Sequence, residues 1–212
     1  MRLAGPLPTL TAVGLTALLL VAGCGGAKAP ANGSGPNAGK QSCSVGAASL
    51  QGAPAGATTL GSSATPVQLI HDQPLAEVFT ASASFSSVGV QSPTWFTQGS
   101  GYTLTLHQGP GLKGKVVVCS VFTDAVDNQW NALDLSTAAA AGVYTLEMSD
   151  PTGTATAACP GHESAPNCST TPLSGKKGGV IGWWAAAAGA DSDNYALVAG
   201  KQNGDLFTLF YQ

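Results

Sequence analysis

The chain has 212 residues, of which 44% are hydrophobic and only 9% are charged, and its formal net charge is −3. Charged residues make up about a quarter of an ordinary soluble protein, so small polar residues and glycine must cover most of this surface. The small negative charge, with no basic cluster larger than Lys176-Lys177, excludes nucleic-acid binding. The length allows one large domain, or one domain with a tail.

The N-terminus has the organisation of an export signal. Arg2 supplies a short positive region, and residues 10–22 (LTAVGLTALLLVA) form an apolar run. A helix that spans a bilayer needs roughly 20 apolar residues, and this run is shorter. Residues 1–23 are therefore predicted to be a signal peptide.

The apolar run ends in Val21-Ala-Gly-Cys24, and this ending resembles the lipobox of bacterial lipoproteins. The resemblance implies cleavage before Cys24 and a diacylglycerol on its sulfur, because thioether formation needs a good nucleophile. Two or more acyl chains would then hold the exported protein stably on the membrane, facing the extracytoplasmic side. The alternative is an ordinary signal peptide with an accidental cysteine.

The next segment lacks hydrophobic periodicity. Residues 24–41 are almost wholly Gly, Ala, Pro, Asn, Ser and Lys, a composition that buries too little to offset its ordering entropy. We expect a flexible tether here and a folded domain over residues 42–212. Residues 42–64 are expected to be irregular and tied down through Cys43.

The rest of the chain reads as short strands with turn signals between them. Residues 101–107 (GYTLTLH) alternate strictly, which is typical of a strand with one buried face. Gly99-Ser-Gly101 is expected to turn the preceding strand into this one, and Asn203-Gly204 to close a hairpin near the C-terminus. The predicted strands span residues 66–70, 74–80, 85–90, 102–107, 115–122, 130–135, 143–148, 180–184, 195–199 and 206–211. No helical pattern of convincing length appears, so the fold class is all-β, an antiparallel β-sandwich or jelly roll.

The order of several motifs resembles a set of secreted bacterial jelly-roll modules. These motifs are VGVQSPTW, GYTLTLH, DNQW before LDL, GVYTLEMSDPTGT, IGWW and the closing YALVAGKQNGDLFTLFY. The modules are galactose-binding-like sandwiches attached to glycoside hydrolases and other cell-surface proteins. The resemblance covers residues 66–211 and its motifs are mostly structural. It therefore implies the fold more than it implies a ligand.

Four cysteines are left once Cys24 is set aside, and an even number in an exported protein predicts disulfides. Cys159 and Cys168 bracket a loop rich in Pro, Gly and Ser and are expected to pair with each other. Cys43 would then pair with Cys119. The alternative, a metal site on Cys159, His162 and Cys168, lacks the CxxC spacing and a clear fourth ligand.

No pattern for catalysis can be assembled. The chain has no GxSxG elbow, no HExxH and no Gly-rich phosphate loop, and His71, His107 and His162 are far apart in sequence. The carboxylate pairs Asp124/Asp127 and Asp191/Asp193 lie in polar segments where turn formation is their expected role. The protein is therefore predicted not to be an enzyme. No cofactor is predicted, with a structural calcium ion on residues 191–194 as an open alternative.

Aromatic residues are the most informative signal for function. Trp183 and Trp184 are adjacent, so they must point to opposite sides of a strand. Trp95 and Trp130 are out of phase with the apolar faces beside them, and rings on the non-core side suit stacking on a sugar. The predicted ligand-binding residues are Trp130, Trp95, Trp183, Asp127 and Asn128. The alternative is that each tryptophan fills the core.

These patterns together give two hypotheses. The first is a lipid-anchored, non-catalytic extracytoplasmic module that binds carbohydrate or another cell-envelope polymer. The second is a structural or protein-binding surface lipoprotein with no glycan site.

Overall fold

The structure is a computed structural model, and it describes residues 42–47, 49–152, 179–188 and 193–212. The chain divides into two units, Met1–Lys40 and Gln41–Gln212, and the description below concerns the second. The predicted signal peptide, Cys24, the tether, the Cys159–Cys168 pair, His162 and Asp191 all lie outside the described residues. No described segment forms a helix with the length and apolar character needed to cross a membrane.

Every regular element of the described residues is a β-strand, which confirms the all-β prediction. The strands are β1 (Ser44–Val45), β2 (Thr58–Leu60), β3 (Thr65–Gln68), β4 (Leu75–Ala81), β5 (Phe85–Ser92), β6 (Tyr102–Gln108), β7 (Lys115–Phe122), β8 (Gln129–Ala139), β9 (Gly142–Ser149), β10 (Gly182–Ala187), β11 (Tyr195–Val198), β12 (Lys201–Gln202), β13 (Asp205–Phe207) and β14 (Leu209–Tyr211).

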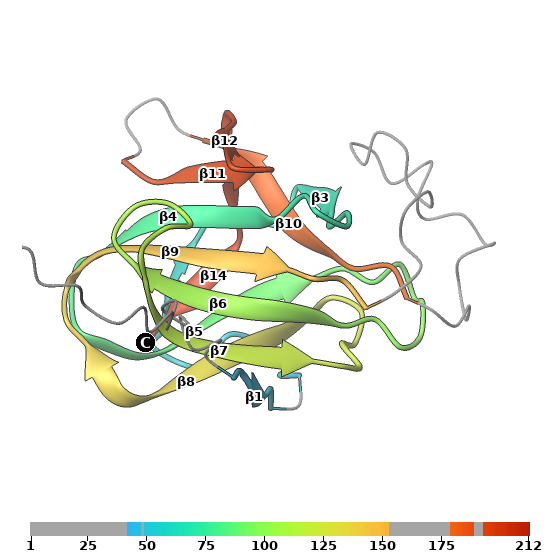
Figure 1. The fold of residues 1–212 in the computed structure, drawn as a ribbon, viewed down its shortest axis with the longest axis horizontal. Helices are drawn as coiled ribbons and strands as arrows, with labels where there is room; N and C mark the ends of the chain where they lie inside the picture. The colour runs from blue at the N-terminus through green and yellow to red at the C-terminus, as the bar shows by residue number, and fades with distance from the viewer. Residues whose placement is uncertain (1–41, 48, 153–178, 189–192) are drawn as a thin grey trace, which may run out of the picture. The chain divides into compact units, whose positions relative to one another are not determined.

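The strands form three sheets. A seven-stranded sheet has the order β1-β7-β6-β9-β4-β11-β12, a four-stranded sheet has the order β2-β14-β5-β8, and a three-stranded sheet has the order β13-β10-β3. The pairings are antiparallel except that of β1 with β7. In Figure 1 the arrows of β4, β9, β6 and β7 lie side by side in front of β5 and β8. The arrangement is that of a β-sandwich.

The core lies between the seven-stranded and four-stranded sheets and follows the period-two pattern. Tyr102, Leu104 and Leu106 of β6 are fully buried in one cluster with Val88 and Val90 of β5. Successive strand residues point to opposite faces, so alternation along each strand places one set of side chains inside. The same cluster includes residues of the three-stranded sheet.

Four aromatic rings join the two large sheets. Phe79 of β4 lies 6.0 Å from Tyr144 of β9 between ring centroids, and both contact Phe85 of β5. Tyr211 of β14 stacks on Phe79 at 5.7 Å. Such pairs add about 0.5–1.5 kcal/mol each beyond the area that they bury.

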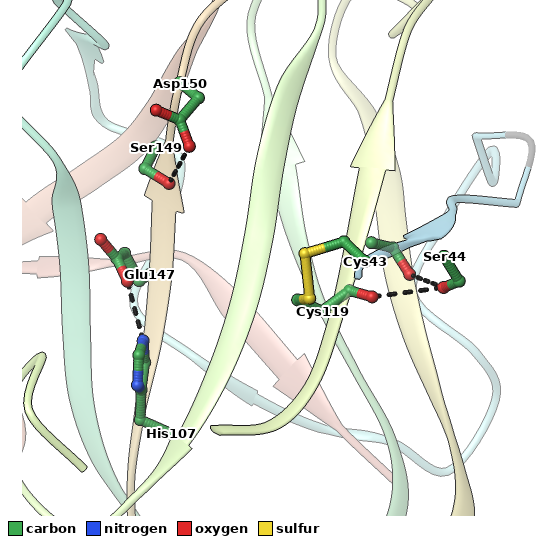
Figure 2. The surroundings of a disulfide bond; sticks show 8 residues. Cys43, Ser44, His107, Cys119, Glu147, Ser149 and Asp150 are labelled. Atoms are coloured by element: carbon green, nitrogen blue, oxygen red, sulfur yellow. Dashed lines mark hydrogen bonds and ion pairs between the residues drawn. A yellow bond between two sulfur atoms is a disulfide. The ribbon is translucent and has the colours of Figure 1, made fainter. Parts of the chain in front are cut away.

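The predicted Cys43–Cys119 disulfide is present, with the two Cα atoms 4.8 Å apart (Figure 2). It holds the start of an N-terminal strap, residues 42–47 and 49–60, against β7. Beside it the Ser44 hydroxyl donates to the Cys119 carbonyl at 3.2 Å. The strap was expected to be irregular, and this expectation is wrong in part. β1 extends the seven-stranded sheet and β2 extends the four-stranded sheet.

The turn predicted at Gly99-Ser-Gly101 does not make a hairpin. β5 pairs with β8 and β14, whereas β6 pairs with β7 and β9, so the chain crosses from one large sheet to the other here. Both β5 and β6 have the period-two pattern. This pattern predicts a buried face, but it does not predict which strand pairs with which.

The C-terminal hairpin also differs from the prediction. β11 pairs with β12 through a turn at Ala199 and Gly200, both with positive φ, and not through Asn203-Gly204. The predicted last strand is divided into β13, which pairs with β10, and β14, which pairs with β5 and β2. β8 runs on to Ala139, past the predicted end of this strand at Leu135.

Candidate binding pocket between the sheet-crossing loops

A small pocket lies where two of the loops that carry the chain between the large sheets meet. The loops, called the crossing loops below, are residues 93–101 between β5 and β6 and residues 123–128 between β7 and β8. The pocket has a volume of about 160 Å³. It is called the ring pocket below, and its lining residues are Pro66, Pro93, Trp95, Phe96, Asp127, Asn128 and Trp184.

The backbone around this pocket is unusual. Six non-glycine residues in the described part of the chain have positive φ, and three of them line the pocket: Trp95 (50°), Phe96 (58°) and Asn128 (59°). Asparagine tolerates this left-handed region, but a bulky aromatic residue there is a genuine outlier. Backbone strain of this kind costs of order 1–3 kcal/mol and is concentrated at functional sites.

Asp127 holds the two crossing loops together. Its Oδ1 accepts a hydrogen bond from the Thr94 backbone N–H at 2.6 Å and a second one from the Thr94 hydroxyl at 3.2 Å. Its Oδ2 accepts from the Asn128 amide at 2.7 Å. Thr94 is fully buried and Asp127 only partly so. Bonds to a carboxylate are roughly twice as strong as neutral ones, so this residue fixes the loop geometry.

Asn128 links the crossing loops to β10. Its backbone N–H donates to the Ser92 carbonyl at 3.0 Å, and its side-chain Oδ1 accepts from the Trp184 indole N–H at 2.8 Å. This hydrogen bond holds the half-buried Trp184 ring in place as part of the pocket wall.

The two adjacent aromatics of the first crossing loop have different environments. Trp95 is 6% exposed, and its ring lies against Gly182, where an added Cβ would stand 2.8 Å from the ring carbon Cη2. Phe96 is 67% exposed. Burial therefore accounts for Trp95 but not for Phe96, whose ring faces solvent at the mouth of the pocket.

The structure brings together three of the five predicted ligand-binding residues, namely Trp95, Asp127 and Asn128. Trp130 and Trp183 are not at this pocket. Trp130 is 7% exposed and contacts Phe210 edge-on at 5.4 Å.

Trp183 is fully buried, stacks on Phe207 at 4.7 Å and donates its indole N–H to the Thr208 carbonyl at 2.7 Å. The prediction that Trp183 and Trp184 point to opposite sides is confirmed by their burial. The aromatic at the pocket is Trp184, not Trp183, because the register of β10 turns the even-numbered residue outward.

Sequence reasoning missed Phe96 altogether. The available signal was the Trp-Phe pair itself, since two adjacent large aromatics in a Gly- and Ser-containing loop have no strand periodicity to bury them both.

A second polar site lies on the outer face of the seven-stranded sheet. His107 Nε2 lies 2.7 Å from Glu147 Oε2 (Figure 2). His107 Nδ1 lies 3.3 Å from the Gly114 carbonyl. Both partners only accept, so the arrangement is fully satisfied by the doubly protonated ring. The bond to Glu147 raises the pKa of His107, against the lowering effect of burial. This pair is covered and satisfied, which is what a structural role requires.

Glu77 of β4 is a buried carboxyl among the described residues. It is fully buried, its Oε2 accepts from the Phe207 backbone N–H at 2.9 Å, and its Oε1 has no hydrogen-bond partner. Burial raises the pKa of Glu77 to about 8, and the bond from Phe207 opposes this shift.

The segment of the calcium alternative, residues 191–194, lies partly outside the described residues, which resume at Asp193. Asn194 Oδ1 accepts from the Thr80 backbone N–H at 2.9 Å, which is a structural bond. No group of three or more His, Cys, Asp or Glu side chains in the described ranges is placed to hold a metal ion.

Comparison with known protein families, with curated proteins and with solved structures finds no match to this chain. Its function therefore has to be inferred from its own geometry and chemistry.

Proposed function

We propose that this protein is a lipid-anchored, non-catalytic extracytoplasmic module that binds a carbohydrate in the ring pocket. The proposal includes export by the predicted signal peptide, lipidation at Cys24 and a sandwich of the galactose-binding-like jelly-roll type. The β-sandwich agrees with that type at the level of fold class.

One observation carries the proposal. Two neighbouring aromatics hold a left-handed backbone at the mouth of a pocket, and one of them, Phe96, stays 67% exposed. A strained backbone that presents an apolar ring to water is costly for folding, and binding is the gain that offsets it.

The size and polarity of the pocket favour a sugar. A volume of about 160 Å³ suits one six-membered ring, since a cavity of about 150 Å³ holds benzene. Aromatic faces at Phe96 and Trp184 supply apolar contact, and Asp127 and Asn128 lie beside them to bond hydroxyls.

Phe96→Ala tests the site. In native affinity gels that contain a neutral polysaccharide (hydroxyethylcellulose, glucomannan or β-glucan), the detergent-solubilised full-length protein should be retarded. The variant should bind about tenfold more weakly, because a lost stacking contact costs on the order of 1–2 kcal/mol. Its melting temperature should be unchanged. Val143→Ala is the control, because Val143 is 40% exposed and does not line the pocket. Wild-type protein that none of these polymers retards would leave the structural or protein-binding alternative.

A separate test concerns the anchor. Wild-type protein should partition into the detergent phase on phase separation, and Cys24→Ala should remain unprocessed or be released. Wild-type protein that stays wholly in the aqueous phase would contradict lipidation without affecting the binding proposal.

A further inference from the structure

The ring pocket is the first of three hollows that share lining residues. The second, called the middle hollow, has a volume of about 300 Å³ and shares Phe96 and Asp127 with the ring pocket. The third, called the strap hollow, also has about 300 Å³ and shares Asp124, Ala125 and Val126 with the middle hollow. The three follow one another along the second crossing loop.

The far wall of the strap hollow is the N-terminal strap, through Gly46, Ala47 and Ser49. This wall is firmly held. The Gly46 N–H donates to the Val121 carbonyl at 2.8 Å, and the Ser49 hydroxyl donates to Asn131 Oδ1 at 2.7 Å. The Cys43–Cys119 disulfide fixes the segment that precedes it. A wall that is fixed in advance lowers the entropic cost of binding.

Each boundary between neighbouring hollows carries one exposed apolar side chain beside an aspartate. Phe96 stands between the ring pocket and the middle hollow, and Val126, which is 49% exposed, stands between the middle and strap hollows. Exposed apolar side chains spaced between successive hollows offer repeated contacts along one line.

The charged side chains that line the three hollows are all negative. Asp124 and Asp127 line them, Asp124 is exposed, and no lysine or arginine is among their lining residues. The remaining polar side chains are neutral, as in Gln129 and Asn131 of the strap hollow. Such a surface repels an anionic ligand and accepts an uncharged or cationic one.

We propose that the three hollows form one groove for an extended, uncharged or cationic polysaccharide chain, which runs from Trp184 to the N-terminal strap. The proposal deepens the proposed function and rests on it. A single sugar ring fills only the ring pocket, whereas successive rings of one chain would occupy the middle and strap hollows. A phosphate-, sulfate- or uronate-rich polymer is disfavoured as the occupant, because the two carboxylates repel it.

Chain length is the first test. Binding of cello-, manno- and laminari-oligosaccharides of one to six residues to the full-length protein in detergent should strengthen with length. We expect at least tenfold between one residue and the longest chain of a bound series, measured by calorimetry.

A blocking variant locates the extension. Ala47→Trp places a large ring in the strap hollow at an exposed position, and Ala55→Trp adds the same ring on the strap outside all three hollows. Ala47→Trp should weaken the hexasaccharide about tenfold and leave the monosaccharide unchanged, whereas Ala55→Trp should change neither. Equal melting temperatures of the two variants would confirm that folding is intact.

The charge is tested with two polymers of one backbone. Hydroxyethylcellulose is neutral, and carboxymethylcellulose carries carboxylates. The protein should prefer the neutral polymer at low salt, and Asp124→Lys should raise binding of the anionic polymer several-fold, an effect that 0.5 M salt removes.

The outcomes separate the two proposals. Binding that depends on Phe96 but not on chain length or on Ala47→Trp would overturn the groove and leave the single-ring site. A preference for carboxymethylcellulose would overturn the charge assignment. Absence of binding to every probe would overturn both.

Discussion

The aromatic residues of this protein lie in two regions that obey different rules. In the interior, Trp183 stacks on Phe207 and Trp130 packs against Phe210, and all four stand on strands. At the ring pocket, Phe96 stands on a left-handed backbone in a loop and is 67% exposed. Folding stability explains the first group, because each ring removes apolar area from water and fills space. Folding stability does not explain why Phe96 is exposed.

Exposure, more than strand phase, marks an aromatic side chain of this protein as a functional candidate. An aromatic that is out of phase with its strand can still be buried by a second layer, as Trp130 is at 7% exposure. An aromatic residue that a strained backbone keeps exposed, as at Phe96, is the stronger candidate for ligand binding. The carboxylates also fall into two groups. Glu147 forms a hydrogen bond with the buried His107, whereas Asp124 is exposed and lines the hollows.

The largest effect should separate the two neighbouring tryptophans of β10. Trp183→Ala should lower the free energy of unfolding by about 3–5 kcal/mol, because it opens a cavity in the core and leaves the Thr208 carbonyl without its donor. Trp184→Ala, the matched control, should cost about 1 kcal/mol, since that ring is half-buried and loses one hydrogen bond. Urea denaturation measures both. An equal loss of unfolding free energy in the two variants would contradict the distinction between interior and pocket aromatics.

The interior should also carry a pH dependence through Glu77. Its folded pKa of about 8 lies above the unfolded value, so the stabilisation is fully present below about pH 4.5 and is lost as the pH rises through about 8. The loss should be roughly 1.4 kcal/mol per pH unit, or roughly 3 kcal/mol between pH 5 and 7.5.

Glu77→Gln should remove this slope while its amide oxygen still accepts from Phe207. The remaining slope above pH 6.5 would belong to His107, whose raised pKa acts in the same direction. Urea titrations of both proteins at pH 5, 6, 7 and 8 give the difference. Parallel stability curves for the two proteins would show that Glu77 does not take up a proton on folding.

The smallest effect should come from the backbone of Phe96. Phe96→Gly and Phe96→Ala both remove the ring, so both should lose polysaccharide affinity by the same factor of about ten. They should differ in stability, with glycine equal to or up to about 1 kcal/mol better than alanine, because only glycine adopts φ of 58° without strain. A glycine variant less stable than the alanine variant by 1 kcal/mol would mean that this backbone is unstrained.

Much of the architecture could be predicted from local pattern. The predicted bounds of β7 are those observed, those of β6 differ by one residue at the C-terminal end, and those of β4 and β9 differ by one residue at both ends. The Cys43–Cys119 pair was also predicted correctly. The short strands β1 and β2 were missed, because two or three exposed residues that gain order only from pairing with β7 and β14 carry no periodicity of their own.

The candidate site was predictable in part. Asp127 and Asn128 were chosen for lying before Trp130 in sequence, and the structure places them beside Trp95, Phe96 and Trp184 instead. That neighbourhood is made by two loops that each cross between sheets and by a strand from a third sheet. Sequence proximity could not reveal it.

The sequence alone indicates where the longer strands lie and which face of each is apolar, because side-chain direction alternates with every residue and this needs only local information. Only the tertiary structure decided which strands pair, that β5 and β6 lie in different sheets, and which of Trp183 and Trp184 is buried. It also decided that Phe96 is the exposed ring of the pocket. These outcomes depend on contacts between residues distant in the chain, such as Asp127 with Thr94 and Trp184 with Asn128, which local pattern does not encode.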